Sequence, residues 1–182
     1  MKILNGRLGV LQLSIYIKGN DTAEAFKVVY MKILNSSHFT QQSEIDTLKR
    51  GSLFGALSNK SINLLLEKGE ILQLKHGDTL YNDGDSGGCF YIILKGRILF
   101  FRLKQGEYTF VRGFVFGEEL GFIAMIALHN RIGKATAEED SVVLKITSDV
   151  FYDLHETLPT DFGILLLNLS RDMARRIREY TS

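Results

Sequence analysis

The stretch that decides the fold is Cys89-Phe90-Tyr91-Ile92-Ile93-Leu94-Lys95-Gly96-Arg97-Ile98-Leu99-Phe100-Phe101-Arg102. Two runs rich in β-branched and aromatic residues flank Lys95-Gly96, a pattern typical of short strands joined by a turn. Working outward, similar strands are expected at residues 71–74, 79–81, 108–111 and 141–146. Turns that contain glycine separate them, at residues 75–78, 83–88, 105–106 and 112–113. Such closely spaced short strands predict an antiparallel sandwich or barrel.

Helical periodicity flanks this β region on both sides. Before it, residues 43–68 predict two short helices, the first capped by Ser43 and the second by Ser58 or Asn59. After it, a short helix is expected at residues 149–154 and a long one after Pro159. The apolar residues of the long helix form a narrow seam: Phe162, Leu166, Leu169, Met173, Ile177 and Tyr180. Its outer face carries Arg171, Asp172, Arg175, Arg178 and Glu179.

The first fifty residues follow a different pattern. Alternating apolar residues between Leu8 and Ile17 predict a strand, and residues 22–34 predict a helix. The apolar face of that helix would carry Ala25, Val28, Val29 and Ile33. The expected organisation is a strand–helix appendage at residues 1–50, a β domain at 51–158 and a C-terminal lid or dimer helix at 159–182.

Composition restricts the class of protein. The 182 residues are 45% hydrophobic and 24% charged with a net charge of +1, which is typical of a soluble globular chain. So small a net charge produces no electrostatic field that would attract nucleic acid or an anionic membrane, and neither partner is expected. The apolar stretch from Leu8 to Ile17 is too short to span a bilayer. The single cysteine, Cys89, excludes an intrachain disulfide and favours a cytoplasmic setting.

One stretch combines features that suit a nucleotide ligand. It is Gly113-Phe114-Val115-Phe116-Gly117-Glu118, followed thirteen residues later by Arg131. Its glycines permit close backbone approach, its carboxylate can accept sugar hydroxyls, and the guanidinium can clamp a phosphate.

The chain resembles the cyclic-nucleotide-binding domain, the module of catabolite-activator-type regulators, protein kinase regulatory subunits and cyclic-nucleotide-gated channels. The likeness runs from about Phe54 to the C-terminus and rests on three blocks: residues 76–85, residues 89–98, and residues 113–118 with Arg131. It implies a β roll of jelly-roll type, mainly β, with helices before and after it. It also implies a phosphate-binding cassette, a short helix and loop between two strands.

The resemblance assigns roles to seven residues. Glu118 would accept the ribose 2′-hydroxyl, and Arg131 would pair with the cyclic phosphate. Backbone N–H groups around Glu119 and Leu120, at a helix N-terminus, would donate to the phosphate. Further backbone in the pocket would come from Gly117, Gly133 and Lys134. The C-terminal helix would cover the base.

The cassette departs from the family pattern because the interval between Glu118 and Arg131 is a few residues longer than usual. The added residues lie in the apolar segment 122–130, which predicts a buried helix. Three alternatives follow for this site. The cassette helix is longer, Glu119 replaces Glu118 as the carboxylate, or the loop is rebuilt so that no nucleotide fits. A purely structural ion pair between Glu118 and Arg131 is a fourth interpretation.

Enzymatic chemistry has little support in the sequence. The histidines are scattered, and neither a P-loop nor a nucleophile elbow is present. We expect a non-enzymatic regulatory module without metal or cofactor, whose ligand is cAMP rather than cGMP and whose C-terminal helix moves on binding. The seam of that helix would pack on its own roll or form a homodimer. The alternative is a degenerate roll that binds no nucleotide and serves in oligomerisation or docking.

Overall fold

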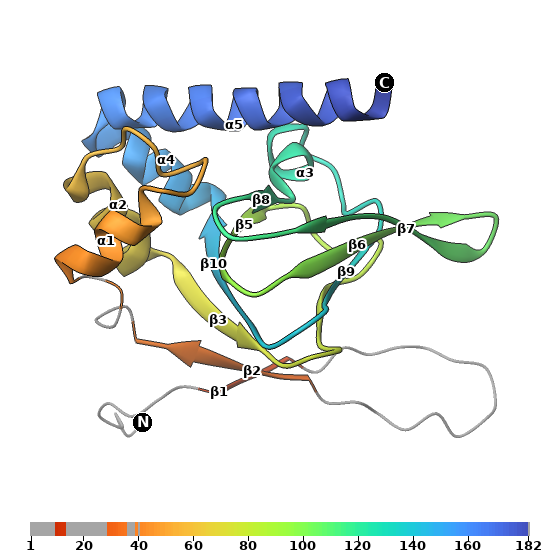
Figure 1. Cartoon of the computed structure of the whole chain (residues 1–182). Coiled ribbons are helices and arrows are strands. Elements are labelled where there is room, and N and C mark those ends of the chain that lie inside the picture. Colours follow the sequence, from red (N-terminus) through yellow and green to blue (C-terminus); the bar gives the residue numbers. More distant parts are fainter. Residues whose placement is uncertain (1–9, 14–28, 36–38, 40, 182) are drawn as a thin grey trace.

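Two antiparallel sheets form the centre of the computed structural model, which describes residues 10–13, 29–35, 39 and 41–181 (Figure 1). The larger sheet has the order β1 (Val10–Leu13), β2 (Val29–Leu34), β3 (Glu70–Leu74), β10 (Ser141–Thr147), β5 (Cys89–Lys95) and β8 (Glu119–Leu120). The smaller sheet has the order β4 (Thr79–Tyr81), β9 (Lys134–Ala137), β6 (Ile98–Lys104) and β7 (Glu107–Phe114). The predicted antiparallel β roll with flanking helices is confirmed.

The helices gather on one side of the roll. They are α1 (Gln42–Leu48), α2 (Asn59–Lys68), α3 (Phe122–Ile126), α4 (Ser148–Thr157) and α5 (Pro159–Thr181). In Figure 1, α1, α2 and α4 cluster at one end, and α5 runs across the molecule from α4 to beyond α3. Within the described ranges, no helix combines the length and the apolar character needed to cross a membrane.

The helix caps agree with the sequence at α2 and differ at α1. Ser58 caps α2, where its Oγ accepts from the backbone N–H of Ser61 at 3.2 Å. The carbonyl of Gln41 accepts from the N–H groups of Glu44 and Ile45, so α1 begins at residue 42. Ser43 therefore lies inside the helix, and its predicted capping role is wrong.

Strand β5 is apolar from Cys89 to Leu94 because both of its faces are buried there. Phe90 and Ile92 pack in a core formed with the helices, whereas Tyr91 and Ile93 face a second core between the two sheets. All four side chains are at most 7% exposed, as predicted for core residues. The alternation of a strand thus divides one apolar run between two cores.

The predicted helix over residues 22–34 is wrong for its last part, and residues 22–28 lie outside the described residues. Val29–Leu34 form strand β2, which pairs with β1 and also with β3. Ile33 stands opposite Leu72, and Leu34 stands opposite Ile71. The open edge of β3 supplies hydrogen-bond partners that a helical repeat cannot use, and this long-range pairing decides the local structure.

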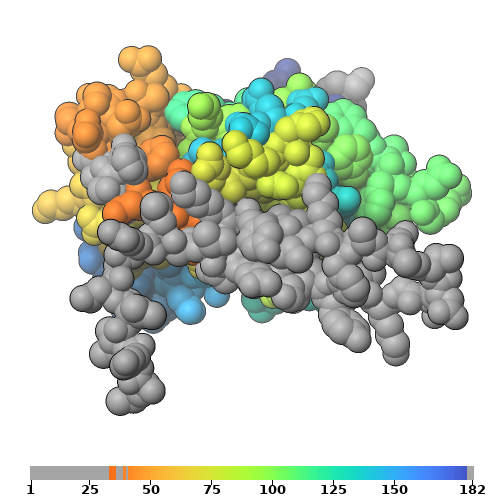
Figure 2. Space-filling view, turned by 90° about the horizontal axis from the view of Figure 1, so that it is seen from below, coloured from red at the N-terminus to blue at the C-terminus, as the bar shows by residue number. Residues whose placement is uncertain are grey.

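The β6–β7 hairpin and α1 lie at opposite ends of the molecule, as Figure 1 and the view from below in Figure 2 agree. Near the tip of the hairpin, Phe101 stacks edge-to-face on Phe110 with 5.8 Å between ring centroids. Closer to the body, β6 pairs with both β7 and β9, and this part of the sheet forms one wall of a cavity.

The apolar seam predicted for α5 packs on its own domain along most of its length. Leu169 is fully buried, and Phe162, Leu166 and Met173 pack against the helical core. Ile177 is 65% exposed. Asp172, predicted on the outer face, is 4% exposed and accepts a hydrogen bond from Ser52 Oγ at 3.1 Å, so that prediction is wrong.

Candidate ligand-binding site

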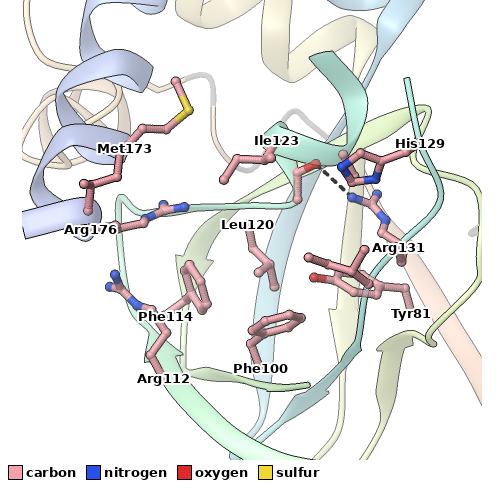
Figure 3. Close-up of a pocket in the computed structure, with 14 residues that line it drawn as sticks. Tyr81, Phe100, Arg112, Phe114, Leu120, Ile123, His129, Arg131, Met173 and Arg176 are labelled. Atoms are coloured by element: carbon pink, nitrogen blue, oxygen red, sulfur yellow. Dashed lines mark hydrogen bonds between the residues drawn. The ribbon is translucent and has the colours of Figure 1, made fainter. Parts of the chain in front are cut away.

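A cavity of about 340 Å³ lies between the smaller sheet, the segment from β8 to α3, and the C-terminal half of α5 (Figure 3). Its lining is mostly apolar, with four basic side chains at the wall: Arg112, His129, Arg131 and Arg176. The apolar lining comes from both layers: Tyr81, Phe100, Phe114, Leu120, Ile123, Ala124, Ile132, Met173 and Ile177. Concave apolar sites with a few convergent polar groups are the usual form of ligand sites.

Arg131 is the buried cation of this cavity and is 4% exposed. Its Nη1 donates to the carbonyl of Gly121 at 2.9 Å, and Nη2 donates to the carbonyl of Cys89 at 2.7 Å. Nη2 also lies 3.2 Å from the Sγ of Cys89, so this buried thiol contacts the site. The Nε of Arg131 is buried without a hydrogen-bond partner among the described residues.

Two tyrosines form an aromatic platform beneath the Arg131 guanidinium. Its Cζ lies 4.5 Å from the ring centroid of Tyr81 and 5.6 Å from that of Tyr91. Burial raises the pKa of both phenols above the ordinary value, and the positive charge of Arg131 opposes this only in part. The phenols are therefore neutral, and they offer the cation a π face rather than a negative charge.

Arg131 thus has no counter-ion in the part of the chain that the structure describes: no carboxylate lies within ion-pair distance of its guanidinium. A buried charge without an ionic partner is costly, even when carbonyl groups solvate it. The arrangement is therefore suited to an anion in the cavity that Arg131 lines.

Two neighbouring carboxylates lie beside the cavity, and each is already paired with an arginine of its wall. Glu118 lies 2.7 Å from Nη2 of Arg112 and also accepts from the backbone N–H of Val115. Glu119 is fully buried, with Oε1 2.5 Å from Nη1 of Arg176 and Oε2 accepting from the N–H of Phe122. Neither carboxylate pairs with Arg131, so the interpretation of Glu118 and Arg131 as an ion pair is wrong.

The comparisons with known proteins agree with this architecture. Residues 71–157 match the cyclic nucleotide-binding domain family. A cyclic nucleotide-binding-like protein from Brucella abortus is 30% identical, and the alignment covers 63% of this chain and 99% of that one with a TM-score of 0.53. The chain belongs to the cyclic nucleotide-binding domain family.

Other members of the cyclic nucleotide-binding domain family resemble larger parts of the chain. The cyclic AMP receptor protein of Thermus thermophilus is 26% identical over 133 residues, which cover 72% of this chain and 60% of that protein. A cyclic nucleotide-binding domain from Methylobacillus flagellatus is 20% identical with a TM-score of 0.70, over 82% of this chain and 84% of that one. At that identity the likeness concerns the fold. The chain spans 60% of the length of its Thermus relative.

The structure brings two of the seven predicted site residues, Leu120 and Arg131, to the cavity wall. Glu119 and Leu120 form strand β8, paired with β5, and α3 begins only at Phe122. Their expected position at a helix N-terminus is therefore wrong. The structural reason is that the β5–β8 pairing continues through Leu120 before the chain turns at Gly121.

Three more of the predicted site residues, Gly117, Gly133 and Lys134, are not part of the cavity wall. Gly117 adopts a φ of 79° and packs against the backbone of Gly51. Gly133 is close to Phe101 O and the Phe100 ring, where any Cβ would overlap them. Lys134 begins strand β9 and pairs with Phe101. Their predicted ligand contacts stay predictions.

Gly121 and Arg176 are among the residues of the site that the sequence did not predict. Gly121 has a φ of 93°, and a Cβ there would overlap Nη1 of Arg131. Arg176 is 12% exposed at its side chain. A signal for Arg176 was present, because it follows the seam residue Met173 by three positions and so shares its face. The described residues contain no cluster of three or more metal-binding side chains.

Proposed function

We propose that the cavity binds a cyclic nucleotide and that the domain is a non-enzymatic regulatory module. The observation that carries this proposal is Arg131, a buried guanidinium at the cavity wall without a carboxylate partner among the described residues and with a free Nε–H. A cyclic phosphate has one negative charge and acceptor oxygens, which match a guanidinium in a site shielded from water.

We assign the ribose to Glu119 rather than Glu118. Glu118 is occupied by Arg112 and by the backbone of Val115, whereas Oε1 of Glu119 receives no hydrogen bond of good geometry. An ionised carboxylate accepts and does not donate, so it suits a sugar hydroxyl. Glu119 Oε1 also lies 2.5 Å from Nη1 of Arg176, a residue of the cavity wall.

The base would meet α5, whose contribution to the cavity wall includes Met173 and Ile177. These apolar side chains offer no hydrogen bonds to a base edge. Guanine has more polar groups to satisfy than adenine, and a buried polar group without a partner costs about 1–3 kcal/mol. The apolar part of the wall that α5 supplies therefore supports cAMP over cGMP.

The proposed output is a movement of α5, since this helix both lines the cavity and leaves an apolar strip exposed. Leu167 and Ile177 are 55% and 65% exposed and lie ten residues apart, so they are separated by roughly 80° around the helix, which is within the width of one helix face. A second copy of the chain is the partner we propose for this strip. Light scattering across a concentration series would reveal a dimer, which Ile177→Glu should weaken.

Calorimetric titration with cAMP and with cGMP tests the ligand. Wild-type protein should bind cAMP, and Arg131→Gln should lose at least about 10-fold in affinity, the value of one charge-assisted hydrogen bond. Arg102→Gln is the matched control, because Arg102 is an exposed arginine of the same smaller sheet. A thermal melt of each variant separates loss of binding from loss of fold.

The alternative is the degenerate roll that binds no nucleotide. It is favoured by one specific observation: the Arg131 guanidinium already donates to the carbonyls of Gly121 and Cys89. Absence of heat with either nucleotide, from folded wild-type protein, would establish this alternative and overturn the proposed ligand.

A further inference from the structure

The last turns of α5 are held to strand β8 by the side chain of Arg176. Its Nη1 lies 2.5 Å from Oε1 of Glu119, and its Nη2 donates to the backbone carbonyl of the same residue at 2.6 Å. The guanidinium also lies over the ring of Phe114, with 5.1 Å from Cζ to the ring centroid. One side chain of α5 therefore makes two polar contacts and one π contact with the roll.

Arg176 stands between the cavity and Glu119. Arg176 lines the cavity, whereas Glu119 does not appear in its wall and is fully buried. Figure 3 shows Arg176 reaching from α5 into the space beside Leu120 and Ile123. A ligand that enters the cavity therefore meets the Arg176 guanidinium first. The Glu119 carboxylate lies behind that guanidinium.

The polar contacts of Arg176 with Glu119 Oε1 are close but imperfect. Nη1 lies within ion-pair distance of Oε1, yet Oε1 receives no hydrogen bond of acceptable angle. A well-directed hydroxyl could make the hydrogen bond that this guanidinium does not make. If a ligand hydroxyl replaces Arg176, the buried Glu119 carboxylate still has a hydrogen-bond partner. Loss of Arg176 without a ligand would leave it without one.

The earlier turns of α5 have separate anchors. Asn168 Nδ2 donates to the carbonyls of Leu53 and Gly55 at 3.0 and 2.8 Å, and Ser52 Oγ donates to Asp172. These contacts lie before Met173 and do not involve the cavity. Release of Arg176 would therefore loosen the C-terminal turns of α5, where Arg112 Nη1 also lies 3.4 Å from Oε2 of the exposed Glu179, while the first part of the helix stays in place.

We infer that the Arg176–Glu119 pair is a latch that competes with the ligand. In the ligand-free domain the Arg176 guanidinium is paired with the Glu119 carboxylate. Hydroxyl groups of the ligand reach Glu119 only after Arg176 has moved away from it. This inference rests on the proposed function, because it makes the ligand of the same cavity the agent that opens the latch. It makes Arg176 the residue that links occupancy of the cavity to the position of the end of α5.

Two measurements on Arg176→Met test the latch, with Arg171→Met as the matched control. Arg171 is an exposed arginine of the same helix that donates to Oδ1 of Asn168 and not to β8. The first is hydrogen–deuterium exchange of the amides of residues 173–181 without nucleotide. Exchange should be faster in Arg176→Met and unchanged in Arg171→Met. Unchanged exchange in Arg176→Met would overturn the latch, whatever the nucleotide data show.

The second measurement is the affinity for cAMP. Arg176→Met should bind at least about 5-fold more tightly than wild type, since the domain no longer spends most of its time latched. Equal or weaker binding overturns the competition and leaves the proposed function standing. Faster exchange without binding by any variant supports the latch and overturns the proposed function. If Arg176→Met does not fold, Arg176→Gln keeps a donor and gives the same readouts.

Discussion

Gly51 and Gly117 pack backbone to backbone, although Gly51 precedes the β roll in the sequence and Gly117 lies between β7 and β8. A Cβ on Gly51 would lie 2.7 Å from the Cα of Gly117, and a Cβ on Gly117 would overlap Gly51 in turn. Next to this contact, Ser52 Oγ lies 3.0 Å from the carbonyl of Gly117 and 3.1 Å from Oδ2 of Asp172. The turn before β8 is thus joined to α5 through the segment that follows α1.

The Gly51–Gly117 contact predicts an unusually large cost for Gly117→Ala. Gly117 combines a φ of 79° with this close approach, so a methyl group meets both backbone strain and overlap. We expect a loss of about 2–4 kcal/mol in the free energy of unfolding, measured by urea denaturation.

Gly77→Ala is the control for the cost of placing alanine at a positive φ without any overlap. Gly77 has a φ of 82°, and no atom lies within 4 Å of the place that a methyl group would take, so this variant should lose only about 1–2 kcal/mol. Equal losses at the two positions would show that the packing of Gly117 on Gly51 contributes nothing.

Most strands of the roll could be predicted from local pattern, including the three-residue β4, but β8 and β9 could not. Strands such as β5 and β10 bury enough apolar residues for their period to be visible in the sequence. Strand β8 has two residues, and β9 (Lys134–Ala137) contains Lys and two Ala, which are poor strand formers. Their conformation depends on pairing with β5 and β6, which no local signal encodes.

The position of Arg131 at the cavity wall could be predicted, and the arrangement of the carboxylates beside the cavity could not. Arg131 stands out because it follows the Gly117-Glu118 motif, although at a longer interval than the family pattern has. Which of two adjacent carboxylates faces inward depends on the pairing of Glu119 with Ile92 across two strands. The partner of that carboxylate, Arg176, lies 57 residues away on another element. Spacing along the chain contains no information on such a contact.

Substitutions of Tyr81 would measure how much the aromatic platform contributes to nucleotide affinity. Its ring lies 4.5 Å below the Arg131 guanidinium, and Tyr81→Phe keeps this ring. Tyr81→Leu removes the cation–π contact, worth about 0.5–2 kcal/mol, so nucleotide affinity should fall roughly 2- to 30-fold. Calorimetry on both variants checks this. A loss that is equal for Phe and Leu would assign the effect to the hydroxyl and not to the ring.

Asp161 predicts a pH dependence of stability. Burial alone would raise the pKa of this carboxyl group, but hydrogen bonds from Ser58 and Ser61 and the charge of Lys49 outweigh it, and the pKa is lowered from 3.8. The bonds are short: Oδ1 accepts from Ser58 N at 2.7 Å and from Ser61 Oγ at 3.1 Å. The first turn of α5 thereby holds the N-terminus of α2.

The folded protein therefore favours the ionised form of the Asp161 carboxyl group. Its contribution is fully present above the ordinary pKa of 3.8 and is lost as the pH falls through the lower folded value. Asp161→Asn should cost about 1–2 kcal/mol near pH 7, measured by urea denaturation, and the difference from wild type should shrink below about pH 4. Asp83→Asn, at an exposed turn, should show no such trend. A difference that stays constant down to about pH 3 would mean that the Asp161 charge has no part in holding α2.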